Sequence, residues 1–312
     1  MSHVDLENGS IRFTERIQAA IQCFAPSAAL QLIEALEGGV SATMARIEIR
    51  LPDGSIHKYV VRTPGKWTAE EPPGFIEREY KILQQVSQTG ILSPNPVYLE
   101  PPGMEDRCYI LEYIEGAPEL KPLDPVAYGR AFAELHAQIH GLDLQRHGLQ
   151  DTRHLPTKIR TLGDPTCHQP WEGEARSLLD RFGPLEDVNP PVFRHGDLWP
   201  GNVLWLDGRV SGIVDWENAS LGEPLFDIAI TRLDLLWVAG WEATHAFTDY
   251  YLHLNPIDSS KLALFDLVAA LRLSGAIEMI VPAYPPLGRP DVTAESLTRD
   301  LGEFVDSALT RV

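Results

Sequence analysis

The sequence predicts an α+β protein with two lobes, and two observations carry this prediction. Short strand-like runs and helical segments alternate over residues 1–115, whereas the pattern from Pro122 onward is mostly helical. Glycine and proline accumulate where the pattern changes, in EYIEGAPELKPLDP. We therefore expect an N-terminal lobe over residues 1–115 and a C-terminal lobe over residues 116–312, each with its own core and with a ligand cleft between them.

The N-terminal lobe is predicted to be a small antiparallel sheet with one main helix. Residues 13–37 have a helical pattern broken by Pro26. Polar and apolar residues alternate in ATMARIEIRL and HKYVVRT, which flank the turn signal PDGS and predict a hairpin. A helix is predicted over GFIEREYKILQQVSQTG, ending at Gly90, and two further strands over PVYLEP and CYILEYIEG.

The C-terminal lobe is predicted to be mostly helical. Helical periodicity is present in PVAYGRAFAELHAQIHGLD and WEGEARSLLDRFGPL, and several helical segments follow to the end of the chain. Two short strands interrupt this pattern, in GNVLWLDG and VSGIVDWE, and the turn residues Asp207 and Gly208 join them.

The charge of the chain limits its partners. The formal net charge of −18 argues against a nucleic-acid or anionic-membrane partner, because both require a basic surface. From Asp215 to Val312 there are 15 acidic and 6 basic residues, a net charge of −9. This excess could attract a cationic small molecule, although a solvated acidic surface that keeps the protein soluble is the more common explanation.

No targeting or membrane segment is predicted. The opening MSHVDLENGS carries acids and no apolar run. The most apolar stretch, Leu262 to Val281, is interrupted by Asp266, Arg272 and Glu278, and is typical of a buried helix. Three widely separated cysteines form no metal or disulfide pattern. We therefore expect a cytoplasmic protein.

The segment RHGDLWPGNVLW carries residues suited to phosphoryl transfer. That reaction needs a group that orients and deprotonates a hydroxyl, together with oxygen ligands for Mg²⁺. Asp197 can accept the proton, and Asn202, five residues later, can offer a side-chain oxygen to the metal. Asp215 follows the second of the two strands, at the end of the apolar run GIV, where its carboxylate can point back to the same site.

HGDLWPGN followed by IVDWE resembles the signature of the aminoglycoside phosphotransferase and choline kinase family, small-molecule relatives of the protein kinases. Protein kinases separate their catalytic Asp and metal-binding Asn by the same five-residue step. The resemblance implies a bilobal protein-kinase-like fold. It also implies that Asp197 is the catalytic base and that Asn202 and Asp215 hold Mg²⁺.

The resemblance extends to residues that would bind the nucleotide. LEGGVSATMARIEI matches the family's nucleotide-covering loop, although it is not a GxGxxG motif and is equally typical of a turn. CYILEYIEG matches the hinge, whose backbone groups would hold adenine. The nucleotide-binding residues implied in these two segments are Gly39, Ser41, Thr43, Glu112, Tyr113 and Ile114.

The chain departs from the family pattern at Arg62. The family carries a Lys at this position of the third strand, paired with a Glu on the helix that here contains Glu79. Arg keeps the charge and can bind phosphate in a bidentate manner, but it is not a neutral replacement for Lys. We expect a working Arg62–Glu79 ion pair. A degenerate site is the alternative, in which both residues are ordinary surface groups.

Supporting roles follow from the same resemblance. His195 is expected to brace the catalytic loop through hydrogen bonds rather than to transfer protons, and Asp227, in LGEPLFDIA, to brace the same loop. Glu217 is expected to assist the metal or orient the loop. His136 and His140 have the i, i+4 spacing of metal ligands, but no third ligand is evident, and we expect packing residues.

The resulting hypothesis is a Mg²⁺-dependent kinase that uses ATP or GTP and phosphorylates a hydroxyl of a small molecule. Two classes of acceptor fit this hypothesis. One is an antibiotic (an aminoglycoside or a macrolide), and the other is a metabolic alcohol such as choline, homoserine or a sugar. The alternative is a nucleotide-binding module without kinase activity, which only Arg62 favours. A Ser/His/Asp hydrolase is excluded because the chain has no GxSxG motif. The sequence predicts neither the nucleotide preference nor the oligomeric state.

Overall fold

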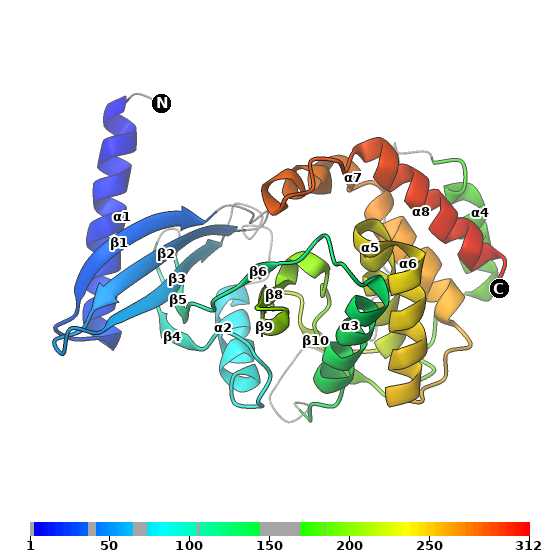
Figure 1. The fold of residues 1–312 in the computed structure, drawn as a ribbon, viewed down its shortest axis with the longest axis horizontal. Coiled ribbons are helices and arrows are strands. Elements are labelled where there is room, and N and C mark those ends of the chain that lie inside the picture. The colour runs from blue at the N-terminus through cyan, green and yellow to red at the C-terminus, as the bar shows by residue number, and fades with distance from the viewer. Residues whose placement is uncertain (1–2, 37–41, 65–73, 105–106, 144–168, 184) are drawn as a thin grey trace. The chain divides into compact units, whose positions relative to one another are not determined.

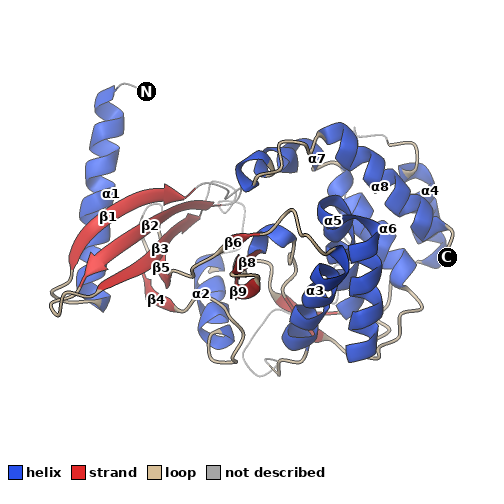
Figure 2. Cartoon of the chain, in the orientation of Figure 1, coloured by secondary structure: helices blue, strands red, loops and turns tan. Residues whose placement is uncertain are grey.

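The computed structural model describes residues 3–36, 42–64, 74–104, 107–143, 169–183 and 185–312. The chain divides into two compact units, Met1–Glu115 and Gly116–Val312. Strands dominate the N-terminal unit, whereas helices dominate the C-terminal unit (Figure 2). Within the described ranges, no helix combines the length and the apolar character needed to cross a membrane.

The N-terminal unit contains one antiparallel sheet with strand order β1-β2-β3-β5-β4 (Figure 1). Helix α1 contacts β1 and β4, and helix α2 contacts β4. The elements of the unit are α1 (His3–Phe24), β1 (Ala29–Leu36), β2 (Ala42–Arg50), β3 (Ile56–Pro64), α2 (Phe75–Val86), β4 (Pro96–Leu99) and β5 (Tyr109–Glu112).

The predicted hairpin around PDGS is confirmed. β2 and β3 pair in continuous register from Ala42 opposite Pro64 to Arg50 opposite Ile56. Alternate residues of β2, including Ile47 and Ile49, are buried on the face covered by α1. This two-residue period is what a sheet with one buried face requires.

The expectation of helix over residues 27–37 is wrong. α1 ends at Phe24, just before Pro26, and the following segment forms the strand β1. Its residues, ALQLIEAL, are good helix formers, but β1 pairs with β2 along its length and buries Leu30 and Ile33 partly against the core. Long-range pairing therefore overrides the local helical propensity.

The C-terminal unit is a helical assembly with two small sheets, β10-β7 and β6-β8-β9. α5 packs against α3 and α6, and α6 packs against α8 (Figure 1). The helices are α3 (Pro125–His140), α4 (Glu172–Phe182), α5 (Pro224–Leu254), α6 (Leu262–Ser274), α7 (Ile277–Ile280) and α8 (Ala294–Leu309), with 3-10 turns η4 (Pro200–Asn202), η5 (Val281–Ala283) and η6 (Pro285–Leu287). The strands are β6 (Ala117–Pro118), β7 (Val192–Arg194), β8 (Val203–Leu206), β9 (Arg209–Ile213) and β10 (Ser220–Gly222).

Two details of this unit position the segment with the predicted catalytic residues. β8 and β9 form the predicted hairpin, and its turn residues Asp207 and Gly208 have φ of 51° and 73°, as a tight two-residue turn requires. The segment from Arg194 to Trp205 therefore runs from β7 through η4 into β8, while Asp215 follows β9. The hairpin brings the two ends of the motif to the same side of the unit.

Candidate active site

The segment between β7 and β8 is a turn tied to the first turn of α5. The backbone N–H groups of His195 and Gly196 donate to the two carboxylate oxygens of Asp227, at 3.0 and 2.9 Å. Asp227 is 2% exposed. These bonds fix the backbone directly before Asp197, which is the bracing role expected for Asp227.

Asp227 is held as a carboxylate although it is buried. Burial opposes ionisation, but the hydrogen bond with His140 and nearby positive charge outweigh it and lower the pKa of Asp227 below its ordinary value. His140 Nε2 lies 3.4 Å from Asp227 Oδ2, and its Nδ1 lies 2.7 Å from the hydroxyl of Tyr251. His140 thus supports the loop indirectly and is not part of a metal cluster among the described residues.

His136 also has a packing role, as expected. It is fully buried, its Nδ1 contacts the carbonyl of Phe132 at 2.9 Å, and its Nε2 contacts the Thr231 hydroxyl at 3.1 Å. Burial lowers the pKa of His136 to about 3, so the ring is neutral at physiological pH.

His195 connects the catalytic loop to the segment after β9. Its Nε2 lies 3.0 Å from the carbonyl of Val214, and its ring packs on Trp216 with centroids 4.6 Å apart. Burial lowers the pKa of His195 to about 4. A neutral ring whose Nε2–H donates to a carbonyl is suited to bracing and is a poor proton shuttle.

Asp197 combines partial exposure with a raised pKa. Burial, together with the nearby acids Asp215 and Glu217, raises the pKa of Asp197 to about 6, and Arg272 opposes this rise. Because 35% of the side chain is still exposed, solvent moderates the shift. A carboxylate that titrates near neutral pH and reaches solvent is suited to accepting a proton from a bound hydroxyl.

Asn202 is fixed by bonds at both ends. Its side-chain Nδ2 donates to the backbone carbonyl of Asp197 at 2.9 Å. Its backbone carbonyl accepts from the N–H of Val214, also at 2.9 Å. The hydrogen bond between Asn202 and Asp197 therefore closes the turn between them and occupies the amide nitrogen of Asn202. The amide oxygen, on the other arm of the planar group, is the atom that suits a hard cation.

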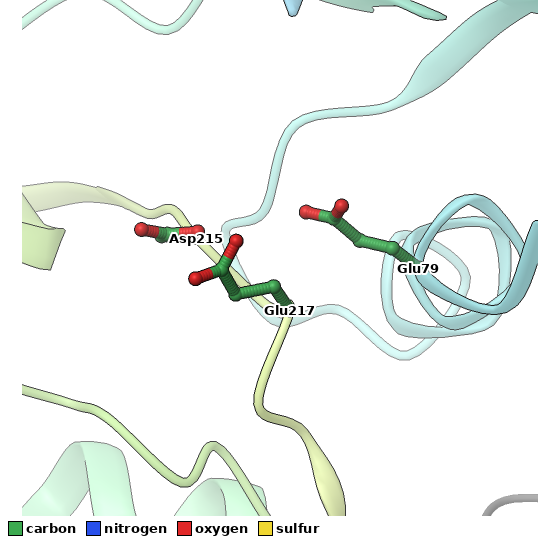
Figure 3. Close-up of side chains that lie close together, drawn as sticks. All are labelled: Glu79, Asp215 and Glu217. Atoms are coloured by element: carbon green, nitrogen blue, oxygen red, sulfur yellow. The ribbon is translucent and has the colours of Figure 1, made fainter. Parts of the chain in front are cut away.

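Asp215 and Glu217 project from the segment after β9. Trp216 between them is fully buried and donates from its indole nitrogen to the carbonyl of Ile213 at 3.0 Å, whereas both acids are half-buried. Asp215 has a φ of 63°, in the left-handed region that non-glycine residues rarely adopt. Carboxylate oxygens of the two acids lie within 4.8 Å of each other (Figure 3). With the Asn202 amide oxygen, this oxygen-only donor set fits Mg²⁺.

The N-terminal unit contains the expected ion pair. Arg62, on β3, places Nη1 3.6 Å from Oε1 of Glu79, which lies on α2 and is also labelled in Figure 3. The two side chains are only 7% and 1% exposed, so neither is an ordinary surface group. The pair is therefore maintained with Arg in place of the family's Lys.

The predicted hinge begins at Glu112, the last residue of β5, and two of its three backbone N–H groups are hydrogen-bonded. Glu112 donates to the carbonyl of Asn95 at 2.9 Å, and Tyr113 to the carbonyl of Lys58 at 3.1 Å. In the part of the chain that the structure describes, the Ile114 N–H makes no such bond. Of the predicted loop residues, Thr43 is exposed on β2, while Gly39 and Ser41 lie outside the described residues.

The sequence analysis missed Arg272 as a site residue. It lies on α6, and its Nη2 is 3.7 Å from Oδ1 of Asp197. No motif includes a residue 75 positions after Asp197. The available signal was an isolated cation in the helix LALFDLVAALRLS, whose other residues are apolar except Asp266 and Ser274.

A family model matches most of the chain. The model described as "Phosphotransferase enzyme family" matches residues 33–263, which is more than half of the chain. The chain therefore belongs to the phosphotransferase enzyme family that includes the aminoglycoside phosphotransferases and choline kinases. The predicted resemblance is confirmed.

Curated relatives match over part of their length. Acyl-CoA dehydrogenase family member 11 of Gallus gallus is 26% identical over 184 residues, which cover 52% of this chain and 23% of that protein. The chain thus spans less than a quarter of that relative. A probable ketoamine kinase of Thermus thermophilus is 27% identical over 192 residues, covering 57% of this chain and 67% of the relative. A homoserine kinase of Rhizobium etli is 25% identical over 207 residues, covering 60% and 63%.

Solved structures identify the fold. A candidate aminoglycoside phosphotransferase from Ralstonia eutropha has a TM-score of 0.65 at 21% identity, covering 96% of this chain and 97% of that one. A choline kinase from Streptococcus pneumoniae has a TM-score of 0.59 at 19% identity, covering 96% and 98%. The predicted α+β, protein-kinase-like fold is confirmed.

Gly196→Ala is expected to destabilise the catalytic loop. Gly196 has a φ of 83°, and a Cβ there would lie 2.4 Å from the backbone oxygen of Asn218. We expect a loss of about 2 kcal/mol or more in the free energy of unfolding, from strain and close contact together. Gly208→Ala is the matched control, because its φ is 73° but no heavy atom lies within 4 Å of the added Cβ. Chemical denaturation measures both variants, and equal losses would contradict the close-contact argument.

Proposed function

We propose that this chain transfers the γ-phosphoryl group of ATP or GTP to a hydroxyl of a small molecule. The observation that carries the proposal is the braced Asp197, next to the fixed amide of Asn202, in a chain of the phosphotransferase family. In the reaction the acceptor oxygen bonds to the γ-phosphorus, the bond to the β-phosphate oxygen breaks, and the acceptor proton moves to Asp197. ADP or GDP is the leaving group.

Residues of the C-terminal unit are proposed to hold the metal. Asn202 and Asp215 would bind Mg²⁺ through oxygen, and Glu217 would support Asp215 from the same segment. When bound, Mg²⁺ neutralises charge on the β- and γ-phosphates. Asp197 orients the acceptor hydroxyl, and His195 and Asp227 keep that carboxylate in position.

Residues of the N-terminal unit are proposed to bind the nucleotide. Arg62, oriented by Glu79, would contact the α- and β-phosphates, and the buried ion pair between them supports a working site over a degenerate one. The Ile114 N–H and the carbonyl groups near it would receive adenine or guanine. The remaining proposed nucleotide-binding residues are Gly39, Ser41, Thr43, Glu112 and Tyr113.

The acceptor is proposed only as a class. The named relatives and structural neighbours include a ketoamine kinase, a homoserine kinase, a choline kinase and antibiotic phosphotransferases, so a hydroxyl on a small polar molecule is what they share. The test is a phosphate-transfer screen over hydroxyl-bearing metabolites and antibiotics, with both ATP and GTP. Absence of transfer, together with absence of Mg²⁺-dependent nucleotide binding, would contradict the proposal.

Asp197→Asn is expected to remove most turnover while leaving nucleotide affinity nearly unchanged. The amide has the size of the carboxylate but cannot take the proton, and general-base catalysis contributes on the order of 10²–10⁴-fold. Steady-state kinetics and calorimetry with the Mg²⁺-nucleotide separate the two effects. Asp207→Asn, on the exposed turn between β8 and β9, is the control. Retained turnover in Asp197→Asn would refute the assigned base.

Asp215→Asn is expected to weaken metal-dependent nucleotide binding, because it removes a charged oxygen ligand. Calorimetry of ADP binding with Mg²⁺ and with a chelator gives the increment in affinity due to the metal. This increment should decrease in Asp215→Asn and stay unchanged in Asp207→Asn. An unaltered increment in both variants would exclude Asp215 as a ligand.

Activity is expected to depend on the ionisation of Asp197. Because the carboxylate is the form that accepts a proton and its pKa is raised to about 6, kcat/KM should rise with pH through about 6 and level off above it. Nucleotide and acceptor affinities, determined over the same range, correct for titration of the substrates. A profile that is flat through this range after correction would contradict the assignment.

A further inference from the structure

Arg272 lies beside the proposed base although no motif includes it. Its Nη2 is 3.7 Å from Asp197 Oδ1, and the two side chains are 26% and 35% exposed. α6 is otherwise apolar along most of its length, and Arg272 lies in its last turn. A cation in the last turn suits the helix dipole, and the contact with Asp197 brings its charge to the proposed base.

One arm of the guanidinium is buried without a protein partner. Nη1 of Arg272 is inaccessible to solvent and makes no hydrogen bond to any described residue. An unsatisfied buried donor is unfavourable, more so when it is charged. The planar guanidinium has five N–H donors and the side chain is 26% exposed, so its accessible N–H groups can bind a second anion beside Asp197.

The catalytic loop itself contains no cation. The residues between Asp197 and Asn202 are LWPG. The ionisable side chains directly after β9, Asp215 and Glu217, are acidic. Arg272 is the cation that contacts Asp197 in the part of the chain that the structure describes. Asp234, a buried acid of α5, interacts electrostatically with both Asp197 and Arg272, and burial together with Asp197 raises the pKa of Asp234 well above its ordinary value.

During phosphoryl transfer, negative charge is spread over the three equatorial oxygens of the group in flight. The acceptor hydroxyl that Asp197 orients is the atom that this group approaches. A guanidinium 3.7 Å from Asp197 is therefore close to the place where the charge develops. Positive charge fixed at such a place stabilises the transition state more than the bound substrates.

We propose that Arg272 is a catalytic residue whose guanidinium contacts both Asp197 and the transferring phosphoryl group. This inference rests on the proposed function. Arg272 forms and breaks no covalent bond, because the proton goes to Asp197 and the electron pair of the broken bond leaves with the β-phosphate. A different role, binding an anionic group of the acceptor itself, predicts a rise in KM confined to anionic acceptors.

The test compares affinity for MgADP with affinity for MgADP plus aluminium fluoride, which imitates the phosphoryl group in flight. Arg272→Gln should weaken binding of the fluoride complex by roughly 10- to 100-fold and leave MgADP affinity nearly unchanged. Arg272→Lys, which keeps the charge but not the fork, should lose less. Arg299→Gln is the matched control, because Arg299 is 64% exposed on α8 and pairs with the adjacent Asp300.

The outcomes separate the inference from the proposed function. If wild-type protein binds the fluoride complex more tightly than MgADP and Arg272→Gln keeps that preference, the inference is wrong and the proposed function stands. If wild-type protein does not bind MgADP, the proposed function fails first. Thermal denaturation checks that each variant is folded. If Arg272→Gln is not folded, Arg272→Lys is compared with wild-type protein instead. A rise in KM limited to anionic acceptors, with fluoride binding retained, also overturns the inference.

Discussion

The carboxylate of Asp227 is the constraint on which the rest of the site depends. It accepts hydrogen bonds from two consecutive backbone N–H groups, of His195 and Gly196, and so fixes the chain direction directly before Asp197. Asp227 lies in the first turn of α5, where the helix dipole favours negative charge. The catalytic loop is therefore attached to the start of α5, and through His140 also to α3.

Two carboxylates within this unit have pKa values that their surroundings shift in opposite directions. Hydrogen bonds and positive charge outweigh burial at Asp227 and lower its pKa, whereas burial and neighbouring acids raise the pKa of Asp197 to about 6. The first group is a permanent anion and suits a structural role. The second changes protonation near neutral pH and suits proton transfer, and Arg272 limits how far its pKa can rise.

Much of the fold and part of the site were predictable, for different physical reasons. The hairpin around PDGS and the five-residue step from Asp197 to Asn202 depend on local turn chemistry, which short segments encode. The strand β1 was predicted as helix because its partner, β2, decides its conformation. Arg272 was missed for a related reason, since only the packing of α6 brings it to Asp197.

The loop is fixed mainly through its backbone, and this explains why the motif does not identify the acceptor. Asp227 binds two backbone N–H groups, Asn202 binds the carbonyl of Asp197, and His195 contacts the carbonyl of Val214. The ring of Trp199 packs against Tyr284, which joins η5 to η6, with centroids 6.0 Å apart. The same backbone can therefore serve different acceptors when the elements around it change. Those elements follow the motif in the sequence and carry no local signature of their ligand. The motif therefore identifies the residues that orient a hydroxyl, whereas the acceptor depends on the packing of the elements around it.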